Sequence, residues 1–257
     1  MGVRPCRGIP CDRCQFRHLG AAHRVCGARS WAGRSALDFA HHFRGVGNCG
    51  RYCGADVDFV DIDPETFNIC PDALASKLEQ AAQAGRLPKI IVAVHMCGQS
   101  PDMARIATLA RAYGVRLIED ASHSIGADYL SQPVGNCAYS DITVFSFHPV
   151  KIITTAEGGM ALTNDAELAA RMERLRSHGI TRDPALMTHT PDGPWYYQQL
   201  DLGWNYRMTD MQAALGLSQM DQLDTFIARR RVLAYAYDEL LADLPLRCPG
   251  RMEGTDS

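Results

Sequence analysis

The sequence contains no run of apolar residues that could cross a membrane, since a spanning helix needs about 18 or more in succession. The N-terminus also has none of the apolar stretch that marks a signal peptide, and we therefore expect the protein in the cytoplasm. No block of like charges is present and the formal net charge is −3. These absences argue against nucleic acid or a membrane as the partner.

Internal repeats and low-complexity segments are also absent from the 257 residues. With 46% apolar and 21% charged residues, the composition is that of an ordinary globular protein. A chain of this length can form one sizeable core or two modest domains.

Cysteine is abundant rather than scarce, with ten residues, six of which lie in the first 53. Cys11 and Cys14 have the spacing of zinc ligands. The sequence has no second CxxC pair, however, and its histidine spacing fits no standard zinc finger, so we expect no metal site. A zinc-stabilised regulatory protein is one alternative, with further ligands drawn from His18, His23, His41 and His42.

From residue 55 onward, stretches typical of strands alternate with stretches typical of helices. The segment 89–95 is almost continuously apolar, as expected for a strand of a parallel sheet that is covered on both faces. Asn164 with Glu167, and Thr209 with Gln212, have the spacing of capping boxes at helix starts. The alternation predicts an α/β fold with a mainly parallel sheet. The expected strands are 57–62, 89–95, 115–120, 142–147 and 158–163, and the expected helices are 71–85, 101–114, 164–178 and 209–241.

The segment 178–210 interrupts this alternation, because it is long, aromatic and irregular. Loops of this length are uncommon inside compact domains unless they serve a function. We therefore expect the segment to take part in function.

A single lysine, Lys151, stands inside the apolar sequence "VFSFHPVKIITTAEGGM". Desolvation in an apolar pocket lowers the pKa of a lysine, which makes a neutral amine available to attack a carbonyl group. The alternative is a lysine whose stem packs on the surface while its ammonium group reaches water. The segment by itself leaves both interpretations open.

A second stretch, "LIEDASHSIGADY", places Asp120 at the end of an apolar strand and His123 one short turn later. Ligands of parallel sheets bind beyond the carboxyl ends of the strands, where Ser146 also lies. A carboxylate there could pair with a protonated ring nitrogen, and an imidazole could bond a phenolic oxygen, which are two requirements of pyridoxal phosphate. The alternative is an aspartate that caps a helix, beside a surface histidine.

Three motifs in order, "LIEDASHSIGADY", "SFHPVKIITTAEGGM" and "GWNYRMTDMQAALGLSQM", together resemble the sugar-nucleotide aminotransferases of the DegT/DnrJ/StrS type. The segment "VHMCGQSPDM" agrees with them, and the sequences of these motifs are most similar to those of members that act in pseudaminic acid biosynthesis. The resemblance covers about residues 48–257. It implies the large domain of a pyridoxal phosphate-dependent transferase of the aspartate aminotransferase-like kind (fold type I), with a mainly parallel sheet that is incomplete at both ends.

The resemblance implies a role for each matching residue. Lys151 matches the lysine that forms the Schiff base with pyridoxal 5′-phosphate, and Asp120 matches the partner of the pyridinium nitrogen. His123 stands near the position of the cofactor phenolate, and Ser146 matches a phosphate ligand. Asn205 matches an asparagine that reaches the cofactor phosphate of a neighbouring subunit, which implies a homodimer.

The implied reaction is transamination of a UDP-linked 4-keto-6-deoxy-N-acetylhexosamine. Glutamate is the implied amino donor and becomes 2-oxoglutarate. Two alternatives are an inactive fragment of such an enzyme and a non-catalytic binding or regulatory protein with the same fold.

The first 47 residues do not fit this resemblance, because they are rich in Arg, Cys, Gly and His and show no clear periodicity. A back-translation shifted by one base yields family-like sequence, so we expect residues 1–47 to be an out-of-frame translation of the gene. Residues 48–245 are then a partial cofactor-binding domain, and residues 246–257 begin a truncated C-terminal small domain. The alternative for the first segment is a genuine, divergent N-terminal extension.

Overall fold

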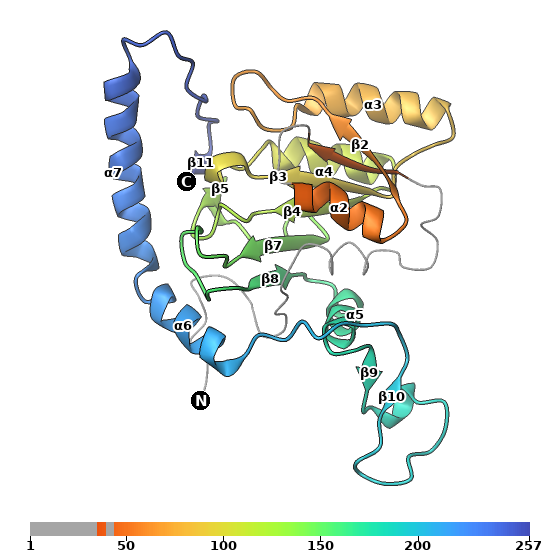
Figure 1. The fold of residues 1–257 in the computed structure, drawn as a ribbon. Coiled ribbons are helices and arrows are strands. Elements are labelled where there is room, and N and C mark those ends of the chain that lie inside the picture. Colours follow the sequence, from red (N-terminus) through yellow and green to blue (C-terminus); the bar gives the residue numbers. More distant parts are fainter. Residues whose placement is uncertain (1–34, 40–43) are drawn as a thin grey trace.

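The structure is a computed structural model that describes residues 35–39 and 44–257. Its centre is a six-stranded sheet with the strand order β2-β1-β3-β4-β7-β8 (Figure 1). Neighbouring strands run parallel except for β8, which is antiparallel to β7. The predicted α/β fold with a mainly parallel sheet is thus confirmed. The strands are β1 (Ser35–Phe39), β2 (Asp56–Val60), β3 (Ile90–Val94), β4 (Arg116–Asp120), β7 (Ile142–Ser146) and β8 (Gly159–Leu162).

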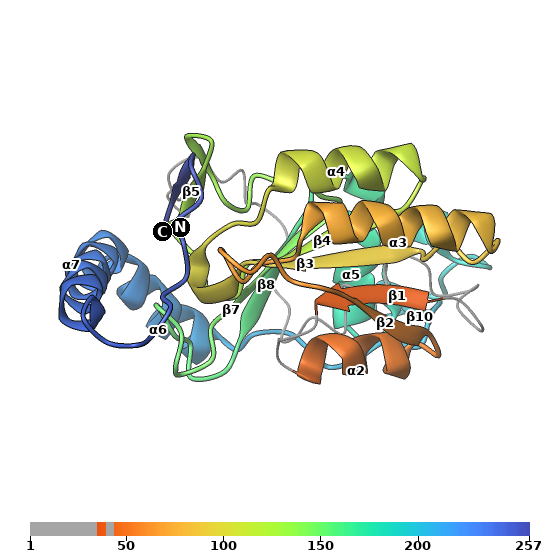
Figure 2. The same cartoon turned by 90° about the horizontal axis from the view of Figure 1, so that it is seen from above.

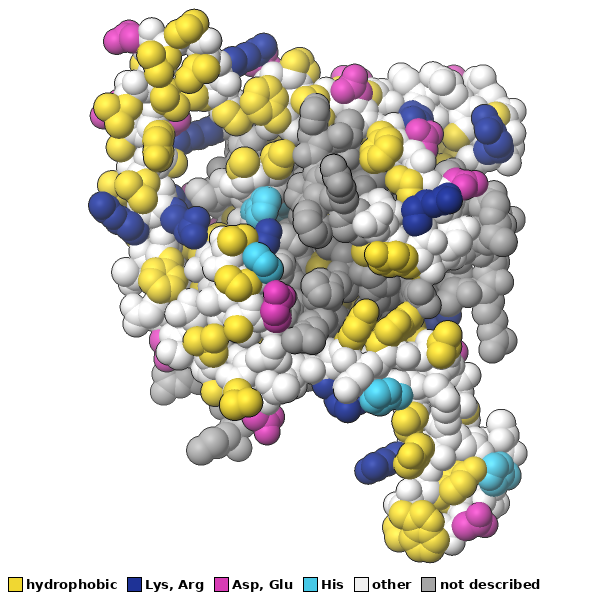
Figure 3. All heavy atoms as spheres, in the orientation of Figure 1, with side chains coloured by type: hydrophobic (Ala, Val, Ile, Leu, Met, Phe, Trp, Pro, Cys, Tyr) yellow, Lys and Arg dark blue, Asp and Glu magenta, His cyan; other side chains and the backbone are white. Residues whose placement is uncertain are grey.

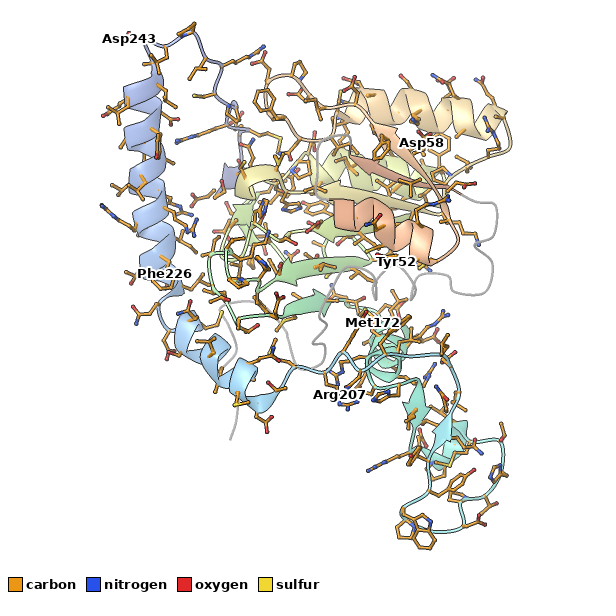
Figure 4. The ribbon with its side chains drawn as sticks, in the orientation of Figure 1. Tyr52, Asp58, Met172, Arg207, Phe226 and Asp243 are labelled. Carbon is orange, nitrogen blue, oxygen red and sulfur yellow. The ribbon has the colours of Figure 1, made fainter. Side chains whose placement is uncertain are left out.

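Helices cover both faces of the sheet. Figure 2 shows α3 (Pro71–Gln83) and α4 (Met103–Ala112) on one face and α2 (Arg44–Tyr52) on the other. The buried side chains of β3 are divided between two core clusters. Ile91 packs in the cluster of α3 and α4, whereas Ile90 packs with Met172 of α5 (Ala166–Arg176; Figure 4). This double coverage explains why Ile90–Val94 is apolar throughout.

The start of α5 differs from the expectation. We expected Asn164 to cap this helix, but Asp165 is the N-cap, and its carboxylate accepts hydrogen bonds from the backbone N–H groups of Glu167 (2.8 Å) and Leu168 (3.1 Å). The side-chain amide of Asn164 instead donates to the carbonyl oxygen of Asn136 at 2.9 Å. Asparagine and aspartate are comparable N-cap residues, so a tertiary contact decided between two adjacent candidates.

Two helices form an arm at one side of the sheet, α6 (Asp210–Met220) and α7 (Leu223–Leu241; Figure 1). The predicted capping box at Thr209 is confirmed. The Thr209 backbone N–H donates to Gln212 Oε1 at 3.0 Å, and the Gln212 N–H donates to Thr209 Oγ1 at 3.3 Å. None of the helices that the structure describes is long and apolar enough to span a bilayer.

Between α5 and α6 the chain extends away from the body of the molecule (Figure 1). This excursion contains an antiparallel pair, β9 (Ile180–Thr181) and β10 (Gln198–Gln199), and a short 3-10 helix, Pro184–Leu186. Trp195, which belongs to this excursion, is 71% exposed. The segment therefore has local structure of its own, and its expected part in function stays a prediction.

The last residues of the chain return to the body of the molecule. Strand β11 (Thr255–Asp256) pairs antiparallel with β5 (Asp128–Tyr129), which pairs with β6 (Gln132–Pro133). A 3-10 turn, Met96–Gly98, follows β3. Whether residues 246–257 begin a second domain stays a prediction.

The expected out-of-frame segment, 1–47, lies largely outside the described residues. Of the part that is described, 35–39 forms β1 between β2 and β3, and 44–47 belongs to α2. The CxxC pair and its candidate histidine partners also fall outside the described residues. Among residues 35–39 and 44–257, no group of three or more His, Cys, Asp or Glu side chains could hold a metal ion.

Candidate active site

Lys151 lies in the turn that follows β7, and its backbone N–H donates to the carbonyl oxygen of His148 at 2.9 Å. Its side chain is only partly accessible to solvent. Burial lowers the pKa of the Lys151 amine, and the carboxylate of Asp120 opposes this effect to a smaller extent. The lowered pKa favours the neutral, nucleophilic amine over a solvated surface ammonium.

Asp120 ends β4 and is 1% exposed. In the sheet register it lies between Val94 of β3 and Val144 of β7. Its Oδ1 atom accepts hydrogen bonds from both the backbone N–H (3.1 Å) and the hydroxyl of Ser122. These contacts fix the carboxylate at the carboxyl edge of the sheet, one strand away from the turn that carries Lys151.

A cavity of about 540 Å³ opens at this edge. Lys151, Ser122 and His123 line its sheet side, and Gln99 lines the side formed by the turn after β3. Side chains of α7 and of the C-terminal segment close the opposite side. The structure thus brings Lys151 and His123 to one cavity, beside the buried Asp120.

Two other predicted residues do not line this cavity. Ser146 ends β7, and its hydroxyl accepts a hydrogen bond from the backbone N–H of His148 at 3.4 Å. Asn205 is exposed and forms an isolated bridge with Ser177, just after the end of α5. The position of Asn205 does not bring it to the cavity of its own chain.

The opposite wall carries three arginines that the sequence analysis missed. Arg231 forms an ion pair with Asp256 at 2.8 Å, and Arg251 lies 4.4 Å from the centre of the Tyr235 ring. Arg230 is exposed at the cavity and forms no ion pair among the described residues. A cavity with basic groups on both sides attracts anions such as phosphates. The sequence signal was available, because three consecutive arginines stand at 229–231 inside an expected helix.

The residues at this edge fit pyridoxal phosphate. The amine of Lys151 has a lowered pKa, a buried carboxylate stands close enough to influence it, and His123 shares the cavity. This cofactor needs three groups from a protein: an amine that binds it covalently, a carboxylate beside the ring nitrogen and a hydrogen-bonding neighbour for the phenolic oxygen. Basic side chains on the facing wall suit its phosphate or that of a substrate.

Comparison with known proteins agrees with this geometry. The model of the DegT/DnrJ/EryC1/StrS aminotransferase family matches residues 30–256. The chain is 36% identical over 198 residues to the UDP-4-amino-4,6-dideoxy-N-acetyl-beta-L-altrosamine transaminase of Campylobacter jejuni, covering 77% of this chain and 48% of that protein. It is 40% identical over 197 residues to the GDP-perosamine synthase of Caulobacter vibrioides, with the same coverages of 77% and 48%.

Among solved structures, a DegT DnrJ EryC1 StrS aminotransferase from Brucella abortus matches with a TM-score of 0.82 and 27% identity, over 95% of this chain and 62% of that one. The match confirms the predicted fold type I and, with the family model, the predicted cofactor. The chain spans about half the length of the curated relatives it matches. It belongs to the DegT/DnrJ/EryC1/StrS family of pyridoxal phosphate-dependent aminotransferases.

Proposed function

We propose that this protein transfers an amino group from glutamate to the C4 carbonyl of a UDP-linked 4-keto-6-deoxy-N-acetylhexosamine. The observation that carries the proposal is the half-buried amine of Lys151, which has a lowered pKa and faces a cavity of about 540 Å³ beside Asp120. The products are 2-oxoglutarate and the 4-amino sugar. The identity to the Campylobacter jejuni transaminase supports this substrate class.

Pyridoxal phosphate, when bound, supplies an aldehyde carbon for the lysine amine and a ring that accepts electrons. Lys151 then has two tasks, to hold the cofactor through its amine and to move the proton between the reacting carbon atoms. Asp120 keeps the proton on the ring nitrogen, because a buried carboxylate stabilises a cation next to it. His123 orients the ring through its phenolic oxygen. The basic groups of α7 attract the diphosphate of the sugar nucleotide.

We further propose that the protein works as a homodimer. Asn205 is exposed and does not line the cavity of its own chain, which suits a side chain that serves the site of a second subunit. Ser146 and the partner's Asn205 then hold the cofactor phosphate together. In this arrangement a single chain has an incomplete phosphate site.

The test is to incubate the purified protein with pyridoxal phosphate, glutamate and a UDP-linked 4-keto-6-deoxy-N-acetylhexosamine, and to detect the amino sugar by mass spectrometry. We expect its formation with the wild type and with Lys77→Met, a control at a lysine that pairs with Asp58 and does not line the cavity, and none with Lys151→Met. A parallel reaction with a GDP-linked 4-keto-6-deoxyhexose tests the activity suggested by the perosamine relative. Cofactor absorbance without either product would favour the alternative of a non-catalytic binding protein.

A further inference from the structure

A buried pair of titratable groups lies behind the candidate site and has no place in the proposed reaction. His95 directly follows β3 and is 0% exposed, and Glu119 of β4 is 5% exposed. The Nε2 atom of His95 lies 3.1 Å from Oε2 of Glu119. The hydroxyl groups of Ser140 and Thr143 donate to the other oxygen, Oε1, of the same carboxylate. Taking such groups out of water is costly, and Nδ1 of His95 has no hydrogen-bond partner among the described residues, so a buried arrangement of this kind calls for an explanation.

The charge state of Glu119 follows from its contacts. Burial by itself raises the pKa of Glu119, but His95 and the hydroxyls of Ser140 and Thr143 outweigh it and hold that pKa below its usual range. Glu119 is therefore a fixed carboxylate at neutral pH and not a proton acceptor. The adjacent thiol of Cys137 stays neutral, because burial raises its pKa to about 11.

The location of the pair connects it to the site. Glu119 and Asp120 are neighbours on one strand, so their side chains point to opposite faces of the sheet. The backbone N–H of His95 donates to the carbonyl oxygen of Asp120 at 3.0 Å. The turn Met96–Gly98 that begins after His95 contributes Cys97 and Gly98 to the cavity wall.

The pair also joins three strands at the same edge. His95 directly follows β3, Glu119 lies in β4, and Thr143 lies in β7, which leads to the turn of Lys151. On its other side the turn after β3 is held by Asn68, whose side chain accepts from the N–H of Met96 and donates to the carbonyl of Gln99, both at 3.0 Å. A break between His95 and Glu119 would therefore loosen the edge of the sheet on which Asp120 and the cavity wall are built.

We propose that His95 and Glu119 are positioning residues that act through Asp120. The pair fixes the carboxyl end of β4 from the face opposite the cavity and thereby keeps the Asp120 carboxylate directed at the cofactor ring. The part of this inference that concerns the cofactor rests on the proposed function. The part that concerns the edge of the sheet does not.

The test compares Glu119→Gln and His95→Gln with Met172→Ala, a control that empties part of the core between α5 and the sheet. Urea unfolding ranks the three variants by stability. Amide hydrogen exchange, measured without cofactor, reports on the N–H groups of His95 and Ala121. The two variants are compared under conditions that give them the same free energy of unfolding. There we expect the exchange rates of both N–H groups to be at least tenfold higher in Glu119→Gln than in Met172→Ala.

A second measurement uses pyridoxal phosphate added to the same proteins. We expect Glu119→Gln and His95→Gln to weaken its binding about tenfold or more, and to change the ratio of its near-ultraviolet and violet absorbance bands in the direction produced by Asp120→Asn. Met172→Ala should leave the affinity and the ratio unchanged. If either single variant does not fold, the double variant, which places two amides side by side, is used in its place.

The outcomes separate the two hypotheses. The inference is overturned if the Glu119 and His95 variants keep the wild-type affinity for pyridoxal phosphate, the wild-type absorbance ratio and the wild-type exchange rates at His95 and Ala121. The pair would then be a structural contact only. A wild-type protein that binds no pyridoxal phosphate would contradict the proposed function, and the exchange rates without cofactor would then decide the part that concerns the sheet edge.

Discussion

Strand β3 and helix α7 are both rich in apolar residues, yet they lie in opposite environments. All five residues of β3 are buried, whereas none of the 19 residues of α7 is. Leu240 of α7 is 75% exposed, and Figure 3 shows hydrophobic side chains along this helix on the visible face. The strand has a layer of helices on each side, while the helix contacts the body along one side only. An apolar pattern thus identifies an element without revealing what covers it.

The candidate site lies between these two regions. Its sheet side, with Lys151 and Asp120, is built on the buried strands, and its other side, with Arg230, belongs to the exposed helix. Rigid elements hold reactive groups in a more precise geometry than mobile elements do. We therefore expect changes on the sheet side to affect the chemical step and changes on the helix side to affect substrate affinity.

The largest effect should come from Lys151→Ala, which removes the reactive amine from the sheet side. Removal of a covalent catalytic group costs about 10⁴-fold or more in turnover. We expect this loss in amino-sugar formation, with an unchanged far-ultraviolet circular dichroism spectrum. Residual turnover above about one hundredth of the wild-type value would exclude Lys151 as the reactive amine.

The stability of the two regions should differ most clearly in a pair of truncations. Ile91→Ala empties part of the core between β3 and the helices α3 and α4, and a change of this kind costs about 2–5 kcal/mol in the free energy of unfolding. Leu240→Ala removes a side chain that is 75% exposed, so we expect a change within about 0.5 kcal/mol. Urea denaturation measures both. A loss above about 2 kcal/mol for Leu240→Ala would mean that another surface covers this part of α7 in solution.

A third change, Asp120→Asn, should lower the turnover of the enzyme while it raises the reactivity of the Lys151 amine. Loss of a preorganised charge partner costs about 10²–10³-fold in turnover. Asp120 raises the pKa of Lys151, against the larger effect of burial. Without its charge that pKa falls further, so more neutral amine is present at a given pH. We expect Lys151 to react faster with an amine-modifying reagent at pH 8 in the variant, as measured by peptide mapping. Slower labelling would contradict this electrostatic assignment.

On the helix side, Arg230→Ala should raise KM for the sugar nucleotide about tenfold, because a charge-assisted contact with a phosphate contributes about 1.5–3 kcal/mol. The turnover number should change little, since this side chain holds the substrate away from the reacting atoms. Arg229→Ala is the matched control, because Arg229 is exposed but does not line the cavity. If both changes raise KM equally, Arg230 acts only through the general positive charge of the surface and makes no specific contact with the substrate.

Much of the sheet side could be predicted from the sequence. The strand ends, and with them Asp120, Ser146 and the turn of Lys151, followed from short apolar runs bounded by polar residues, because a doubly covered parallel sheet requires such runs. The helix side could not be predicted in the same way. Which face of α7 contributes Arg230 to the cavity depends on how the arm lies against the body, and no local pattern encodes that placement. The choice between Asn164 and Asp165 as N-cap likewise depended on a distant carbonyl group, that of Asn136.

The smallest effect concerns the start of the arm. Only Gly216 of α6 is buried, so this helix depends on local interactions more than β3 does. The capping box of Thr209 and Gln212 satisfies two backbone N–H groups that would otherwise lack partners at the helix start. Thr209→Ala should therefore destabilise the first turn of α6 by about 1 kcal/mol. Because so little of the arm is packed against the sheet, we expect the loss to appear as faster amide exchange at residues 211–214, with the global urea midpoint almost unchanged. A matching fall in the global urea midpoint would instead show that the arm and the sheet unfold as one unit. The buried strand and the exposed helix would then differ in burial but not in the transition in which they unfold.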